Sequence, residues 1–212
     1  MDLLANFIDL VLHLDRHLIE LISLHGTWVY AVLFLVIFCE TGLVVTPFLP
    51  GDSLLFVSGA IAATGAMDPG LLVVLLVSAS FLGDNTNYWI GRLAGPRIFK
   101  SNTSRLLNRD YLDKTHRFYE KHGGKAIVLA RFFPIIRTFA PFVAGMGHMD
   151  YRRFIFFSFT GSIAWVGFFV LGGYFFGNIP FIKENLTLMM LAIIFVSILP
   201  GIIGYLRHRF QS

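Results

Sequence analysis

The sequence contains few charged residues and a single cysteine. Only 14% of the 212 residues are charged, whereas a soluble domain carries about 25%. Hydrophobic residues instead make up 56% of the chain. The lone Cys39 excludes a disulfide within the chain and a cysteine-based zinc site, and we expect it to be a small packing residue. These properties predict a polytopic membrane protein that forms one membrane domain over residues 1–212.

Several features of other protein classes are also missing. The N-terminus lacks the basic segment and small-residue cleavage site of a signal peptide. His13 and His17 are four residues apart, but no third ligand is apparent, so we predict no metal or other cofactor. The segment PGDS at 50–53 lacks the histidine of an acid-phosphatase motif, so we do not expect an enzyme. Membrane topology accounts for the net charge of +4, and we therefore expect no nucleic-acid partner.

Two apolar stretches are interrupted by helix-breaking residues, and we predict a re-entrant hairpin in each, at 28–64 and at 125–147. Each arm is shorter than the roughly 20 residues that a helix needs to cross a bilayer. Proline removes a backbone donor and breaks a helix, and irregular backbone at membrane depth must be surrounded by protein or a water-filled cavity. The residues expected to break the helices are Pro47, Pro50 and Gly51 in the first hairpin and Pro134, Pro141 and Gly145 in the second.

The remaining segments complete an all-α architecture. We expect an amphipathic interfacial helix at 1–25, a basic cytoplasmic loop with a helix at 92–124, and membrane-spanning helices at 70–91, 154–175 and 186–206. Residues 92–125 contain nine Lys and Arg against three acidic residues, so the positive-inside rule places them in the cytoplasm. The C-terminus is expected there as well.

This topology predicts an inverted repeat. The basic turns on either side of 125–147 can both be cytoplasmic only if the second hairpin returns to the side from which it entered. The chain then forms two units of opposite orientation, each a hairpin followed by a spanning helix, as in many transporters. A short echo supports the repeat: Tyr88-x-x-Gly91 ends one unit and Tyr174-x-x-Gly177 ends the other.

Four charged side chains lie in the apolar hairpins: Glu40, Asp52, Arg131 and Arg137. An arginine at the bilayer centre costs roughly 2.5–3.5 kcal/mol on insertion scales, so such residues are usually functional. We predict that the two arginines meet the two carboxylates, because pairing lowers the cost of burial. Two sheltered guanidiniums also suit a phosphate, which they grip through charge-assisted hydrogen bonds. The alternative is an ordinary helix end with snorkelling arginines.

A polar segment ends the helix predicted at 70–91. Asp84, Asn87 and Tyr88 fall within about one helical turn, and Arg92 follows them. These residues either form an interfacial cap with a tyrosine belt or line a substrate path. Gly91 and Gly95 form a small-xxx-small pair that is typical of close helix packing.

Three motifs resemble those of the DedA family of bacterial inner-membrane proteins. They are ETGLVVTPFLPGDS from Glu40, GDNTNYWIGRLAG from Gly83 and RFFPIIRTFAPFVAG from Arg131, followed by Gly161 and Trp165. The resemblance covers nearly the whole chain and implies a multi-pass inner-membrane protein with two opposed re-entrant hairpins. It implies a role in membrane homeostasis that depends on the proton-motive force, and in some members the translocation of undecaprenyl phosphate, the C55 lipid carrier. The family's functional acidic pair corresponds to Glu40 and Asp52, and its arginine pair to Arg131 and Arg137.

The expected partners are therefore undecaprenyl phosphate or another anionic lipid, together with protons. Protonation of a carboxylate would release an arginine to bind the anion. Two alternatives stay open: a less selective phospholipid scramblase, and a proton-coupled antiporter of small cations in which the arginines are counter-ions. Assembly into a homo-oligomer is also left open by the sequence.

Overall fold

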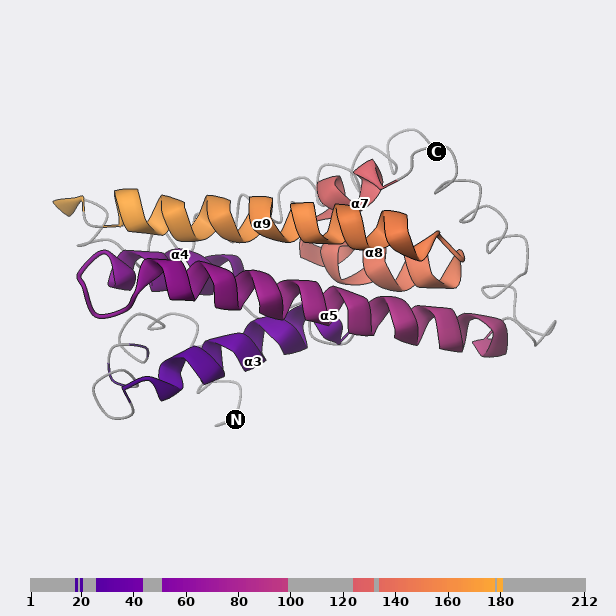
Figure 1. The fold of residues 1–212 in the computed structure, drawn as a ribbon, viewed down its shortest axis with the longest axis horizontal. Coiled ribbons are helices and arrows are strands. Elements are labelled where there is room, and N and C mark those ends of the chain that lie inside the picture. Colours follow the sequence, from indigo (N-terminus) through magenta and orange to yellow (C-terminus); the bar gives the residue numbers. More distant parts are fainter. Residues whose placement is uncertain are drawn as a thin grey trace, which may run out of the picture. The chain divides into compact units, whose positions relative to one another are not determined.

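The computed structural model describes residues 18, 20, 26–43, 51–98, 124–131, 134–177 and 179–180, which contain helices and no strand (Figure 1). The helices are α3 (Trp28–Gly42), α4 (Gly51–Ala62), α5 (Pro69–Ile98), α7 (Lys125–Ala130), α8 (Pro134–Met146) and α9 (Tyr151–Phe176). The predicted all-α class is confirmed for this part of the chain. The interfacial helix, most of the basic loop, the last spanning helix, Pro47 and Pro50 lie outside the described residues.

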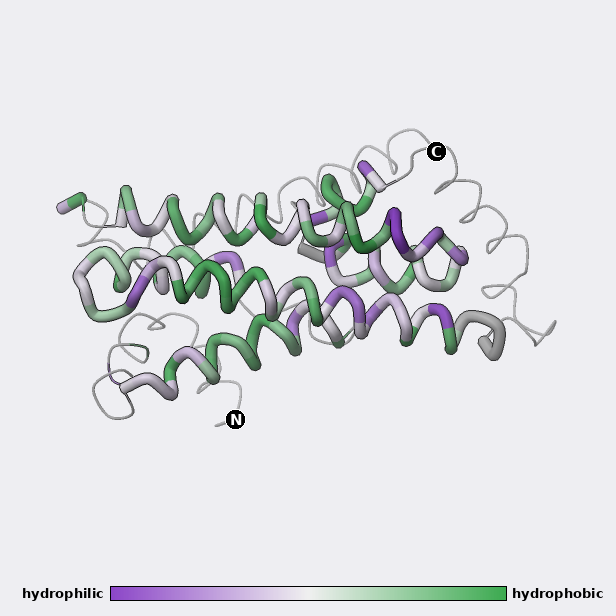
Figure 2. Tube along the Cα trace, viewed as in Figure 1, coloured by the Kyte–Doolittle hydropathy of each residue, from purple (hydrophilic) through white to green (hydrophobic). Residues whose placement is uncertain are grey.

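Two helices are long and apolar enough to cross a membrane. They are Pro69–Ala94 within α5 and Tyr151–Phe176, whereas α3 and α4 are shorter apolar helices. Figure 2 shows that α9 is mostly hydrophobic and that hydrophilic residues gather in the second half of α5. These helices correspond to the spans predicted at 70–91 and 154–175, and the short pair falls within the first predicted hairpin.

The helix α5 continues to Ile98, so the start of the loop predicted at 92–124 is helical. The side chain of Arg92 explains part of this extension. Its Nη1 donates a 2.9 Å hydrogen bond to the hydroxyl of Tyr88 one turn earlier, and its guanidinium lies 5.7 Å from the centre of the Trp89 ring. Contacts between residues three and four apart stabilise a helix, and a cation over an indole adds to them.

The described helices form two compact units, whose bounds differ from those of the two repeats predicted from the sequence. The first contains Met1–Val36, Phe48–Val77 and Ala164–Ser212, and the second contains Ile37–Pro47 and Ser78–Ile163. Helix α4 therefore belongs to the first unit, and α7 and α8 belong to the second. Each of α3, α5 and α9 contributes one part to each unit.

In the first unit, α4 packs antiparallel on the second part of α9, backbone against backbone. A Cβ atom on Gly59 would collide with the carbonyl oxygen of Val170, and one on Gly173 would collide with the carbonyl oxygen of Phe56. Two glycines on opposite helices therefore allow the two backbones to touch. Close approach of this kind is how helices associate in a lipid environment, where apolar burial gives little driving force.

In the second unit, α8 packs on the second part of α5 in the same way. A Cβ atom on Gly145 would collide with the carbonyl oxygen of Tyr88, and one on Gly91 would collide with that of Phe142. The predicted packing role of Gly91 is thus confirmed. The aromatic ring of Tyr88 stacks on Phe154 with centroids 4.4 Å apart, which anchors this helix pair to the start of α9.

Two of the predicted helix breaks are wrong. Pro141 and Gly145 both lie inside α8. Pro141 lacks the N–H that would bond to the carbonyl of Arg137, but packed membrane helices tolerate proline because their surroundings compensate for the lost bond. Gly145 serves packing, since its Cα lies against Tyr88. By contrast, Pro134 and Gly51 are the first residues of α8 and α4, as expected of residues beside a break.

A candidate anion site built from buried ion pairs

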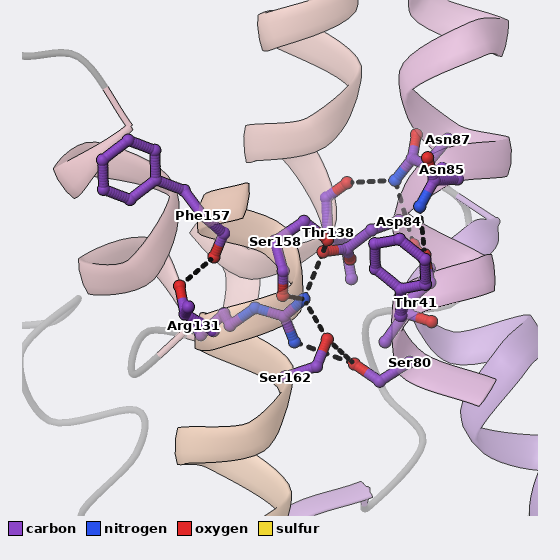
Figure 3. A network of polar contacts seen from close by, with 12 residues as sticks. Thr41, Ser80, Asp84, Asn85, Asn87, Arg131, Thr138, Phe157, Ser158 and Ser162 are labelled. Carbon is purple, nitrogen blue, oxygen red and sulfur yellow. Dashed lines mark hydrogen bonds and ion pairs between the residues drawn. The ribbon is translucent and has the colours of Figure 1, made fainter. Parts of the chain in front are cut away.

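The guanidinium of Arg131, just after α7, is enclosed by polar groups of the second unit (Figure 3). Its Nη2 forms an ion pair with Asp84 of α5. The same nitrogen donates to the Ser162 hydroxyl at 2.8 Å and to the Ser158 carbonyl at 3.2 Å, both in α9. Its Nη1 donates to the Ser80 hydroxyl of α5 at 2.8 Å. Arg131 therefore connects the end of α7 to two spanning helices.

The carboxylate of Asp84 is equally enclosed. Besides Arg131, its Oδ2 accepts a 2.7 Å hydrogen bond from the Ser158 hydroxyl. Asp84 is 1% exposed and Arg131 is 3% exposed. Burying a charge pair is favourable only when further hydrogen bonds satisfy both partners. The serines of this cluster supply such bonds to Oδ2 of Asp84 and to the terminal nitrogens of Arg131, whereas Oδ1 of Asp84 and Nε of Arg131 have no partner in the structure.

The pairing of Arg137 with Glu40 is the second buried ion pair of the second unit. Nη2 of Arg137 donates to Oε1 of Glu40 at 2.5 Å, and the two residues are 3% and 0% exposed. Glu40 lies in the last turn of α3, and Arg137 lies in the first turn of α8. Each charge is therefore at the end of its helix where the macrodipole disfavours it, and each depends on the other for stabilisation.

Asn87 of α5 holds the two helices that carry this second pair. Its Nδ2 donates to the Thr41 carbonyl at 3.0 Å and to the Thr138 carbonyl at 2.6 Å. Thr41 and Thr138 directly follow Glu40 and Arg137 in sequence. The end of α3 also sits close on α5, because a Cβ on Gly42 would lie 3.3 Å from the Cα of Gly83. Asn87 thus fixes the backbone on both sides of the ion pair.

The alternative of snorkelling arginines is wrong, because Arg131 and Arg137 are each 3% exposed. Of the two alternatives for the end of the first span, the interfacial cap is wrong, because Asp84, Asn87 and Tyr88 are buried inside the protein. The Tyr88 hydroxyl donates to the Met149 carbonyl at 2.6 Å. A substrate path along Asp84, Asn87, Tyr88 and Arg92 stays a prediction.

One predicted pairing needs correction. Glu40 does pair with an arginine, but the carboxylate that Arg131 contacts is Asp84, not Asp52. Asp52 belongs to the first unit, where its Oδ1 accepts a 2.9 Å hydrogen bond from the indole nitrogen of Trp165. The spacing of Ser80 and Asp84 could have predicted the missed partner, since residues four apart share one face of an apolar helix.

Metal ligation has no candidate in this part of the chain. Among the described residues, no group of three or more His, Cys, Asp or Glu side chains converges. The charged groups that the site brings together are the two buried ion pairs. An interior of apolar helices with two buried ion pairs defines the class of this protein as a helical membrane protein.

Comparison with known proteins gives the family. The VTT domain matches residues 49–175. Protein DedA of Escherichia coli strain K12 is 58% identical over 211 residues, which cover 99% of this chain and 96% of that protein. An uncharacterized membrane protein of Mycobacterium leprae is 44% identical over 178 residues, covering 84% of this chain and 80% of that protein. The inner membrane protein YqjA of Escherichia coli strain K12 is 37% identical over 161 residues, covering 76% and 73%.

The chain belongs to the DedA family of inner-membrane proteins, as its motifs predict. The VTT match runs from the start of α4 to the end of α9 and so includes Asp84, Arg131 and Arg137. No solved structure matches this chain.

Proposed function

We propose that this protein translocates an anionic lipid, with undecaprenyl phosphate as its cargo, across the inner membrane in a proton-dependent way. The observation that carries the proposal is the ion pair between Arg137 and Glu40, which is buried and joins the end of α3 to the start of α8. A lipid carrier needs a sheltered cation for the head group, while the polyprenyl tail stays in the bilayer.

The chemistry of Arg137 suits a phosphate. A guanidinium presents paired N–H donors that match two phosphate oxygens, and a charge-assisted pair of this kind is among the stronger hydrogen-bonding arrangements. Arg137 also lies in the first turn of α8, and helix N-termini favour anions. A phosphate that replaces Glu40 would therefore be stabilised by the side chain and by the helix end.

Glu40 is the proposed proton-binding group. Protonation removes its negative charge, and Arg137 then becomes a buried cation without its carboxylate partner, which is a costly state. Binding of an anionic head group relieves that cost. Release of the proton on the other side of the membrane restores the ion pair and expels the phosphate. Asp52, the second acidic residue of the predicted site, is proposed as a further proton-sensitive carboxylate.

Two opposed re-entrant hairpins are the proposed framework for this exchange. In the first unit, the Tyr30 hydroxyl near the start of α3 accepts a 2.8 Å hydrogen bond from the backbone of Asp68, after α4. In the second unit, Ile127 of α7 shares a core cluster with Ala144 of α8 and with Met149 beyond it. These contacts support hairpins whose ends return to each other.

The glycine contacts support the inverted repeat. In both units, two α-helices meet through glycines and carbonyls at the same three-residue spacing: 56 and 59 against 170 and 173 in one, 142 and 145 against 88 and 91 in the other. This correspondence pairs Gly91 with Gly173, whereas the sequence echo had paired Gly91 with Gly177. Repeats that meet near the membrane midplane are typical of transporters.

The test is a leaflet-resolved assay of undecaprenyl phosphate in proteoliposomes with an imposed pH gradient. We expect Arg137→Ala to lower the translocation rate by roughly 100-fold or more, the loss expected when a charge is left without its partner. Arg153→Ala, which removes an exposed arginine at the start of α9, is the control and should leave the rate unchanged. A wild-type rate for Arg137→Ala would refute the proposal.

The same assay separates the alternatives. Equal rates for zwitterionic phospholipids and undecaprenyl phosphate would indicate a less selective scramblase. A cation antiporter would tolerate Arg137→Lys, because lysine keeps the counter-charge, whereas a bidentate phosphate site would not. A rate that does not respond to the pH gradient would remove the role of Glu40 as a proton-sensitive partner.

A further inference from the structure

The second buried arginine has a different task from Arg137. We infer that Arg131 is an anchor, held in place by Asp84, and that it makes no bond to the cargo. Asp84 is then a positioning residue for Arg131, helped by Ser158, which donates to Asp84, and by Ser80 and Ser162, which accept from Arg131. This inference rests on the proposed function, because it divides the work of the two arginines at that site.

The hydrogen bonds of the Arg131 guanidinium are the first reason to expect no bond to the cargo. Both terminal nitrogens donate to protein groups: Nη1 to one serine hydroxyl, and Nη2 to a carboxylate, a carbonyl and a second hydroxyl. A phosphate could displace these partners only by leaving several buried polar groups unsatisfied. Such groups are expensive in a low-dielectric interior.

The Nε side of the Arg131 guanidinium faces the backbone of α9. A Cβ atom built on Gly161 would lie 2.8 Å from Nε and 2.9 Å from Cδ of Arg131. The side chain therefore lies against Gly161, where no larger residue fits. Nε itself has no hydrogen-bond partner in the structure, and its contact with the glycine leaves no space for a phosphate oxygen on that side.

The described hydrogen bonds of the Asp84 cluster run among its own members, and Oδ1 of Asp84 has no hydrogen-bond partner in the structure. Ser158 donates to the same Asp84 oxygen that pairs with Arg131, and the hydroxyl of Ser162 donates to that of Ser80 at 3.3 Å. The members come from α5, α9 and the end of α7 (Figure 3). Each network bond strengthens its neighbours in a dry interior, so the loss of any one partner weakens the whole cluster.

The positions of the two arginines at helix ends support the same division of roles. Arg131 is the C-terminal cap residue of α7, where a macrodipole favours a cation and repels an anion. Arg137 lies in the first turn of α8, where an anion is favoured. A phosphate between the two helix ends is therefore drawn to Arg137 and away from Arg131.

The first experiment is a rescue in the full chain. Arg131→Met and Asp84→Leu are each expected to lower the recovery of folded protein strongly, because each leaves one buried charge unpaired. The double variant replaces the pair by apolar residues of similar size, a change that proteins often tolerate. It should recover folding, seen as a symmetric peak in detergent size exclusion, and translocation of undecaprenyl phosphate at the wild-type half-saturating concentration.

The matched pair is Glu40→Leu with Arg137→Met, which should fold but lose translocation. A folded Arg131→Met, Asp84→Leu variant whose half-saturating concentration rises as steeply as that of an Arg137 variant would overturn the inference. Normal translocation by the Glu40→Leu, Arg137→Met variant would instead refute head-group binding by Arg137, and so the proposed function, while leaving the anchor in place.

Conservative variants give a second measurement if the double variant does not fold. Arg131→Lys should reduce the maximal rate, because the serine and carboxylate contacts are lost, with an unchanged half-saturating concentration. Arg137→Lys should raise that concentration by roughly tenfold or more, as expected from the loss of one charge-assisted hydrogen bond. The opposite assignment of these effects would show that Arg131, and not Arg137, contacts the cargo.

Discussion

The two units share a packing scheme but differ in what they bury. Each brings two helices together through a glycine on one helix and a carbonyl on the other, in both directions. The first unit places Asp52 against Trp165, whereas the second encloses two arginine–carboxylate pairs with serines and Asn87 around them. The shared scheme builds the frame, and the difference lies in the buried ion pairs that the second unit contains.

The largest expected difference is between removing Asp84 and removing Asp52. Asp84→Ala leaves Arg131 as a buried cation without its carboxylate, and losing one partner of a buried pair costs about 3–5 kcal/mol. Asp52→Ala should cost less, because Asp52 is half-buried in the structure. Unfolding in mixed detergent and dodecyl sulfate measures both free energies. A smaller loss for Asp84→Ala than for Asp52→Ala would reverse the contrast between the units.

Glycine substitutions test what the units have in common. Gly59→Ala in the first unit and Gly145→Ala in the second each place a methyl group against a carbonyl oxygen, and overpacking of this kind typically costs about 1–3 kcal/mol. The two losses should be similar in the same unfolding assay.

The control for these two variants is Gly167→Ala in α9. A Cβ on Gly167 would meet nothing within 4 Å, and alanine favours a helix more than glycine does. The variant should therefore be as stable as the wild type or slightly more stable. If Gly59→Ala behaved like this control while Gly145→Ala did not, the shared packing scheme would be wrong.

The smallest expected effect concerns the hydrogen bond that joins α3 to the backbone before α5. Tyr30→Phe removes the acceptor of the Asp68 amide. The bond is exposed, so its loss should cost about 0.5–1 kcal/mol. Hydrogen exchange at Asp68 should rise locally, with little change in translocation. A large loss of translocation would mean that the closing contact of the first hairpin is itself part of the transport cycle.

Sequence reasoning predicted much of the frame. The low charge content, the apolar runs and the residues at Gly51 and Pro134 predicted helices and helix starts that the structure contains. The burial of Arg131 and Arg137 and their pairing with carboxylates followed from the cost of a lone charge among apolar residues, but the sequence did not say which carboxylate each arginine meets. These features are local or follow from a strong energetic penalty, so the sequence carries them.

The remaining features depend on which helices meet. Asp52 and Asp84 are both acidic residues in apolar surroundings, and only the packing of the end of α7 against α5 brings Asp84 to Arg131. Pro141 shows the same limit. Its propensity predicts a break, but tertiary packing keeps it inside α8. The serines at 80, 158 and 162 were overlooked because each one alone resembles an ordinary small residue of a membrane helix.

The most direct test of the account is the binding of undecaprenyl phosphate to the protein in nanodiscs, followed by phosphorus NMR. If Arg137 receives the head group, the wild type shifts the phosphate resonance, Arg131→Lys shifts it at the same protein concentration, and Arg137→Lys requires roughly tenfold more protein. Equal titrations for the wild type and Arg137→Lys would contradict the claim that the buried Arg137 is the residue that receives the head group.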